Sequence, residues 1–332
     1  MVHGAGTTDD AHDIVVGLDG SRESFAALRW ALREAGLTGL RVNAVYGWTR
    51  SWDMGDEPQT AEDWERIRIG IRSKLQSWTR EACEGMNFDE DDLIFTSVHG
   101  SGTTALLQIG GKAQQIVVGR RSMGRVMRWF SGSLSETLAE ASEVPVTVVR
   151  CPEDDDSSVE ADIENALSFE EPEHAVTSDG VRASSRHHGD DDMQLPVVVG
   201  VDGSDTSRRA LSFALDVARV HRVPLHALFC WQIKDVGVIA GYENAVAPVS
   251  VAQKHAEAML RDWIARMPSS PDVDVEPHAF HIPASKGLIR ASQYASRVVV
   301  GSRGLSGLDA HFFGSVSKQI VSFAQCTVTV VH

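Results

Sequence analysis

A glycine-rich segment near the carboxyl terminus has the residue types and the spacing to hold phosphate groups. The segment GSRGLSGLDAHFFGS follows a β-branched apolar run and precedes a helical pattern. Gly301, Gly304 and Gly307 let the backbone adopt positive φ angles and approach a ligand without an intervening side chain, so successive N–H groups can face an anion. Gly314 and Ser315 then begin a helix, whose first N–H groups lack intrahelical partners. One loop therefore offers two anion-binding elements that face the same space.

A second loop, VGVDGS, ends the first apolar run of the same half of the chain. If the strands before the two loops are neighbours, their carboxyl ends form the crevice in which open α/β sheets bind ligands. Asp202 would then lie on the floor of the crevice. A carboxylate beside a polyphosphate is unfavourable unless it hydrogen-bonds ribose or base, or binds Mg²⁺; we favour ribose or base over metal. Trp231, at the end of the next strand, is placed to wall a base.

These features occur twice along the chain. The string IVVGLDGS near the amino terminus recurs as VVVGVDGS after an offset of 183 residues, and IVVGRRSMGRVMRWFSGS recurs as VVVGSRGLSGLDAHFFGS after an offset of 182. Two separate strings thus agree on one period, which is the signature of a duplicated unit. We predict two copies of one domain, at 13–150 and 194–332.

Within each copy, β-branched runs alternate with helical patterns. The runs IVVG and VVVG are typical of strands buried on both faces, and apolar residues at helical spacing follow each of them: Ala31 and Ala35 in the first copy, Ala214 and Ala218 in the second. The predicted fold class is α/β: two tandem copies of a five-stranded parallel sheet with helices on both faces, a Rossmann-like α/β/α domain, related by internal pseudo-symmetry.

At these loops the sequence resembles the universal stress proteins, specifically their ATP-binding branch. The family pattern is glycine, two residues, glycine, nine residues, then glycine and serine or threonine; Gly301, Gly304, Gly314 and Ser315 match it without exception. The resemblance covers both copies and leaves out only the linker. It implies an adenine nucleotide alpha hydrolase-like form of the fold, with the glycines and Ser315 holding the phosphates and ribose of ATP. The residues expected to line this second site are Gly200, Val201, Asp202, Trp231, Gly301, Ser302, Arg303, Gly304, Leu305, Ser306, Gly307, Gly314, Ser315, Val316 and Ser317.

The first copy departs from this pattern at one glycine. The same spacing gives Gly119, Ser122, Gly132 and Ser133. Serine tolerates positive φ poorly, at a cost on the order of 1 kcal/mol, so we expect the first site to be weaker or empty. Charge-assisted contacts from the arginines of this loop would recover affinity, although an arginine beside a glycine turn is as often solvated. The residues expected to line this first site are Gly17, Asp19, Gly119, Arg120, Arg121, Ser122, Gly132, Ser133 and Ser135.

The segment between the copies, 151–193, carries most of the charge. It holds 14 acidic residues and two arginines, so it accounts for −12 of the formal net charge of −15. Because it has few large apolar residues, it cannot bury enough surface to offset its ordering entropy, and we expect a flexible acidic linker. A solvated spacer is favoured over a partner-binding segment. The copies themselves show no basic face for nucleic acid.

Composition argues against membrane, secreted, disulfide-bonded and metal-binding proteins. No apolar run approaches the roughly 20 residues needed to span a bilayer, so no membrane partner is expected. The amino-terminal segment is polar and acidic, unlike a secretory signal, and we expect a cytoplasmic protein. The four cysteines form no C-x-x-C pair and the histidines are scattered, so we expect no disulfide framework and no metal site.

Three functions fit these observations. The leading hypothesis is a regulatory or sensor protein of stress responses that binds adenine nucleotide, ATP with or without Mg²⁺. A second is an interaction module whose loops are relics, to which Ser122 points. A third is a slow ATP hydrolase, although no pair of titratable groups stands as acid and base, so we expect no enzyme. Because the family pairs domains through the last strand, the resemblance also implies an intramolecular pair of the two copies, with a homodimer of tandem chains as a further option.

Overall fold

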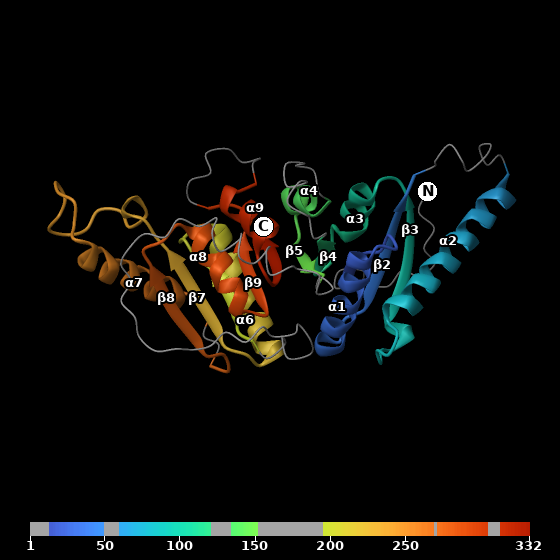
Figure 1. Ribbon diagram of the computed structural model, residues 1–332, viewed down its shortest axis with the longest axis horizontal. Coiled ribbons are helices and arrows are strands. Elements are labelled where there is room, and N and C mark those ends of the chain that lie inside the picture. Colours follow the sequence, from blue (N-terminus) through green and yellow to red (C-terminus); the bar gives the residue numbers. More distant parts are fainter. Residues whose placement is uncertain (1–12, 50–59, 121–133, 152–194, 269–270, 305–312) are drawn as a thin grey trace, which may run out of the picture.

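The computed structural model describes residues 13–49, 60–120, 134–151, 195–268, 271–304 and 313–332 (Figure 1). The strands form one ten-stranded sheet in the order β3-β2-β1-β4-β5-β10-β9-β6-β7-β8. The five strands of each copy pair in parallel, and the two halves of the order mirror each other about the β5–β10 junction. This arrangement confirms the predicted fold class.

Strands and helices alternate in the first copy. Its elements are β1 (Ile14–Gly17), α1 (Arg22–Thr38), β2 (Val42–Trp48), α2 (Ala61–Ala82), a 3₁₀ turn (Glu90–Asp92), β3 (Leu93–His99), α3 (Gly102–Gly110), β4 (Gln115–Arg120), α4 (Leu134–Ala141) and β5 (Val146–Arg150). Because the parallel strands lie between helices on both faces, their sequences are continuous β-branched runs rather than alternating patterns.

The second copy repeats this order. Its elements are β6 (Val197–Gly200), α6 (Asp205–His221), β7 (Leu225–Cys230), a 3₁₀ turn (Ile233–Asp235), α7 (Val249–Ala265), β8 (Val275–Phe280), α8 (Ala284–Ala291), a 3₁₀ turn (Ser292–Tyr294), β9 (Arg297–Gly301), α9 (Ser315–Phe323) and β10 (Thr327–Val331). Among the described residues, no helix has both the length and the apolarity that a bilayer crossing requires.

One face of the sheet has a core that runs through both copies. Helices α3, α4, α8 and α9 cover this face, and a single cluster of buried residues extends from Leu106 and Leu138 in the first copy to Val300 and Ile320 in the second. On the opposite face, α1 with α2 and α6 with α7 cover two separate clusters. Among the described residues, this cluster on the first face is the apolar core that the two copies share.

The junction on the opposite face is polar. Strands β5 and β10 pair antiparallel, with Thr147 opposite Thr329, and their hydroxyl oxygens lie 2.9 Å apart. The Thr147 hydroxyl also donates to Oε1 of Gln115 at 2.6 Å. All three side chains are buried, so these hydrogen bonds satisfy groups that would otherwise be costly to remove from water.

A buried ion pair links the copies beside these threonines. Glu34 of α1 accepts hydrogen bonds at Oε2 from the Arg297 guanidinium of β9 (2.9 Å) and from Nε2 of His221 of α6 (3.0 Å). The guanidinium also lies over the ring of Trp30, 4.6 Å from its centroid. Burial alone would raise the pKa of Glu34, but the charge of Arg297 and the hydrogen bond from His221 together lower it to about 2.

Candidate functional site

The turn after β6 is held by a glycine that rests on a tryptophan. Gly203 has φ +83°, and a β-carbon there would lie 2.6 Å from the ring of Trp263 of α7. Asp202 accepts a hydrogen bond at Oδ1 from the Ser204 N–H at 3.0 Å. The Ser204 hydroxyl accepts from the Ser207 N–H and so caps α6. The residues D-G-S thus form the turn between β6 and α6, orient the Asp202 carboxylate and cap the helix.

The turn after β1 is built in the same way. Gly20 has φ +85°, and a β-carbon there would lie 2.5 Å from the ring of Trp78 of α2. Ser21 caps α1, and its N–H donates to Oδ1 of Asp19 at 3.0 Å. Asp19 is exposed, whereas Asp202 is half-buried. The two copies therefore share the turn but differ in how deeply they enclose its carboxylate.

Strand β9 lies beside β6, so the loop after β9 meets the turn after β6, as a topological switch point requires. A β-carbon at Gly304 would lie 2.5 Å from Oδ2 of Asp202. A β-carbon at Gly301 would lie 2.9 Å from the Thr206 hydroxyl and 3.0 Å from its backbone carbon. The absence of side chains at Gly301 and Gly304 thus lets the two loops touch.

The role expected of these glycines needs a correction. Gly301, Gly304 and Gly314 do not have positive φ, whereas the turn glycines Gly203 and Gly20 do. The motif glycines of β9 are therefore explained by close approach and not by left-handed backbone. Sequence spacing could not separate the two reasons, because both require the missing β-carbon.

Thr206 is a site residue that the sequence analysis missed. Its hydroxyl donates to the carbonyl oxygen of Arg303 at 2.7 Å and so ties the start of α6 to the loop after β9. Its position directly after the capped turn was the available signal. The equivalent position in the first copy is Glu23, whose carbonyl oxygen would lie 2.1 Å from a β-carbon at Gly119. In both copies the first glycine of the motif is thus packed against the start of the first helix.

Helix α9 points its amino terminus at the same loop. The Gly314 N–H donates to the carbonyl oxygen of Ser302 at 2.9 Å, which folds the helix start back onto the end of β9. Ser315 is exposed and Val316 is half-buried at this helix start. The first turn of a helix has N–H groups without intrahelical partners and the positive end of the helix dipole.

Two expected ligand contacts lie elsewhere. The Ser317 hydroxyl is buried and donates to the carbonyl oxygen of Gly301 at 2.7 Å, so it braces the loop instead of facing a ligand. Trp231 has no exposed surface; its indole N–H donates to Gln253 and its ring stacks on His281 at 4.4 Å. The prediction that Trp231 walls a base therefore does not hold in this structure, because core packing already covers the ring.

The remaining residues of the second site support these loops. Gly200, at the end of β6, packs against Leu288, and Val201 is buried. Ser302 is buried, and its N–H donates to the carbonyl oxygen of Val331. Arg303 is exposed. Leu305, Ser306 and Gly307 lie outside the described residues.

Positive charge gathers near the loop after β9. Burial, together with the charges of Arg303 and Arg209, lowers the pKa of His332 to about 4. Burial is the larger cause, and the charges of Arg303 and Arg209 add to it, so both cations lie near the ends of β9 and β10. Two cations at this place suit an anionic ligand.

Arg120 in the first copy has a different role from the one expected. Its guanidinium is half-buried and donates to the carbonyl oxygens of Val321 and Ala324, at 2.8 and 2.6 Å, at the end of α9. Burial and the neighbouring charge of Arg150 lower the pKa of Arg120 to about 10. Arg120 therefore binds the other copy and is not directed at a phosphate.

The rest of the first site is described only in part. Gly17 ends β1 beside Leu106, and Gly119, the residue before the last of β4, packs against α1. Ser135 is buried in α4, at the position equivalent to Ser317. The predicted residues outside the described part of the chain are Arg121, Ser122, Gly132 and Ser133.

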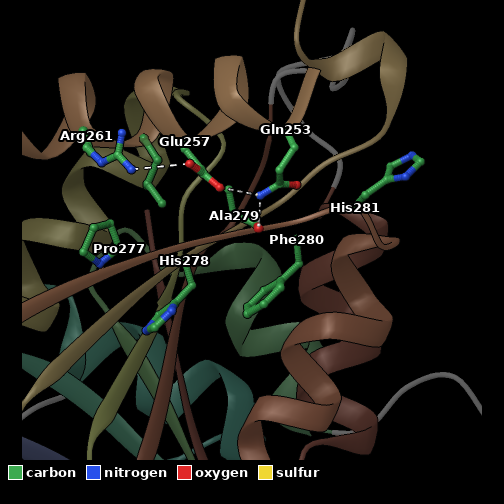
Figure 2. Close-up of a pocket in the computed structure, with 9 residues that line it drawn as sticks. Gln253, Glu257, Arg261, Pro277, His278, Ala279, Phe280 and His281 are labelled. Carbon is green, nitrogen blue, oxygen red and sulfur yellow. Dashed lines mark hydrogen bonds and ion pairs between the residues drawn. The ribbon is translucent and has the colours of Figure 1, made fainter. Parts of the chain in front are cut away.

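A separate groove lies between α7 and the edge strand β8. It encloses about 510 Å³ and is lined by Gln253, Glu257 and Arg261 of the helix and by residues of β8 (Figure 2). The Gln253 amide donates to the carbonyl oxygen of Ala279 at 2.8 Å and so covers part of the strand edge. Strand β7 separates this groove from the β6–β9 crevice. The described residues that line the groove include no glycine.

Comparison with known proteins agrees with the duplicated sheet. The model of the universal stress protein family matches residues 11–150 and again residues 193–332. The chain belongs to this family. A universal stress protein of Mycobacterium tuberculosis is 27% identical over 330 residues, which cover 97% of each chain. Another, from Mycolicibacterium smegmatis, is 29% identical over 331 residues, again 97% of each chain.

Solved structures agree on the fold. A universal stress protein from Archaeoglobus fulgidus matches with a TM-score of 0.60 and covers 98% of this chain and 99% of its own, at 15% identity. A universal stress protein from Pseudomonas aeruginosa matches with a TM-score of 0.51 over 96% of this chain and 92% of its own, at 13% identity. At these identities the likeness concerns the fold.

Proposed function

We propose that this universal stress protein is a cytoplasmic regulatory protein that binds adenine nucleotide, chiefly ATP, in the crevice between β6 and β9. The observation that carries the proposal is the contact of Gly304 with Asp202, where two loops meet with no side chain on the β9 side. The start of α9 folds back onto the same loop through the hydrogen bond from Gly314 to Ser302. These two contacts bring the loop after β9 and the start of α9 together near Asp202.

The chemistry of this residue set fits a nucleotide. Gly301, Gly304 and the first turn of α9 would hold the phosphates through N–H groups and the helix dipole, in the positive field of Arg303. Asp202 would accept a hydrogen bond from a ribose hydroxyl or from the amine of the base. Alternatively, it would bind Mg²⁺ that accompanies the phosphates. Among the described residues of the second copy, we find no pair of side chains beside Asp202 placed to act as general acid and general base. The role that we propose is therefore nucleotide binding and not turnover.

Calorimetry with ATP tests the proposal on Gly304→Asp. The added carboxylate would lie against Asp202 and repel phosphate, so we expect ATP affinity at the second site to fall at least tenfold, or about 1.4 kcal/mol. A matched control is Gly70→Asp, in α2, where a β-carbon would meet nothing within 4 Å. Equal affinity in the two variants would count against the site. Absence of any ATP binding by the wild-type chain would favour an interaction module.

A further inference from the structure

Three side chains converge on the outer strands of the second copy, next to the α7 groove, whose lining includes His278. His226 of β7 pairs in register with Glu276 of β8, and His278 follows two residues later on the same face. Figure 2 shows the His278 imidazole and the Phe280 ring on the side of β8 away from α7. Side chains two residues apart on a strand share a face, and paired residues on neighbouring strands stand side by side.

The donor atoms form a tight triangle. Nδ1 of His226 lies 2.8 Å from Nε2 of His278, and Oε2 of Glu276 lies 3.7 Å from the first nitrogen and 3.6 Å from the second. Three points with these separations lie on a circle of radius about 2.0 Å, which matches metal–nitrogen bonds of about 2.0–2.1 Å and metal–carboxylate bonds of about 2.0–2.2 Å. The three distances therefore leave room for one ion in contact with all three atoms.

We propose that His226, Glu276 and His278 bind a transition-metal ion of the Zn²⁺ class. Two imidazoles and one carboxylate are a donor set that suits Zn²⁺, Ni²⁺ and Cu²⁺, and not the all-oxygen set that suits Mg²⁺ or Ca²⁺. The side chains are 25%, 48% and 32% exposed, so an ion can enter from solvent and keep water as a further ligand. The site is separate from the β6–β9 crevice and does not depend on nucleotide binding.

The protonation state of the pair agrees with a metal. Two imidazole nitrogens 2.8 Å apart cannot both carry a proton toward each other, so at least one presents a lone pair. The neutral imidazole, with its lone pair free, is the form that ligates a metal. An ion would replace the proton that the two rings share.

The first copy provides an internal control. Its outer strands have the same register, and the positions equivalent to the triad hold Asn43, Ile94 and Thr96. None of these side chains is a good ligand for Zn²⁺. The proposal therefore predicts one ion at the described strands of the tandem chain, in the second copy. The sequence analysis expected no metal site because the histidines are scattered along the chain. His226 and His278 are 52 residues apart, and the strand register brings them together.

Titration of the chelator-treated full-length protein with Zn²⁺ tests the site by calorimetry, and Co²⁺ provides a visible absorption spectrum of the bound ion. We expect His226→Gln and His278→Gln each to weaken Zn²⁺ binding at least about tenfold, because even outer-shell partners of a metal contribute that much. Circular dichroism checks that the variants fold. His255→Gln, on α7, and His187→Gln with His188→Gln, outside the described residues, should leave the affinity unchanged.

Two results would overturn the proposal. One is wild-type protein without saturable Zn²⁺ binding and without an intense Co²⁺ spectrum. The other is Zn²⁺ affinity that survives both triad variants but is lost in the double linker variant, which would place the ion on His187 and His188. If His278→Gln unfolds the chain, Glu276→Gln provides the same test, because its side chain is 48% exposed and its loss removes the charge but little packing.

Discussion

Equivalent positions in the two copies carry different side chains at the crevice and at the junction between copies. Ser302 is small and buried beside the second crevice, whereas its counterpart Arg120 reaches across to the end of α9. Arg297 enters an ion pair at the junction, whereas its counterpart Gln115 accepts from a threonine. Glu34, the partner of Arg297, has Val217 as its counterpart. The ion pair of Glu34 and Arg297 therefore corresponds, when the two copies are exchanged, to the uncharged pair of Val217 and Gln115.

The difference shows what duplication leaves open. Strand order, the turns on Trp78 and Trp263 and the helix caps recur because the same backbone must form twice. Residues at the junction and at the crevice can differ between the copies. A buried charge in one copy needs one partner of opposite charge in the other copy, and the equivalent positions need not repeat that pair. The two copies can therefore keep one backbone while their side chains at these places differ.

The largest expected effect comes from breaking the ion pair. Glu34→Val leaves the Arg297 charge buried with its carboxylate partner removed, which costs about 3–5 kcal/mol of unfolding free energy. Glu34→Val combined with Arg297→Gln copies the uncharged pair Val217 and Gln115, and should recover part of that loss because no unpaired charge remains. Urea unfolding of the wild type, the single variant and the double variant measures both effects. A double variant less stable than the single would show that Arg297 stabilises the junction through Trp30 packing and not through Glu34.

Acid should weaken the junction next. The pKa of Glu34 is about 2 in the folded chain, below its ordinary 4.5, so its ionised form is favoured by folding. Its contribution is fully present above about pH 4.5 and is lost as the pH falls toward 2, and the shift corresponds to about 3 kcal/mol. Urea unfolding at a series of pH values should show this slope in the wild type and a shallower one in Glu34→Gln. Parallel slopes would mean that other carboxylates dominate the acid response.

The sequence predicted the repeat, the alternation of strands and helices and the meeting of the two loops. These follow from local patterns and from the topology of parallel sheets. It misjudged Trp231 and Arg120, because whether a side chain at a strand end faces the crevice, the core or the other copy depends on partners distant in sequence. For the same reason the cross-strand contact of His226 and His278 left no local signal.

The smallest expected effect concerns the glycine that distinguishes the two loops. Gly304→Ser gives the second copy the residue that the first has at Ser122. Because Gly304 has an ordinary φ, the added side chain need only displace the Asp202 carboxylate, at a cost of about 1 kcal/mol or about fivefold in ATP affinity. Ser122→Gly in a Gly304→Asp background isolates the first site and should raise its affinity by no more than that factor. A much larger loss in Gly304→Ser would show that the loop reorganises, whereas no change would mean that Arg120 and the junction, and not this glycine, set the difference between the sites.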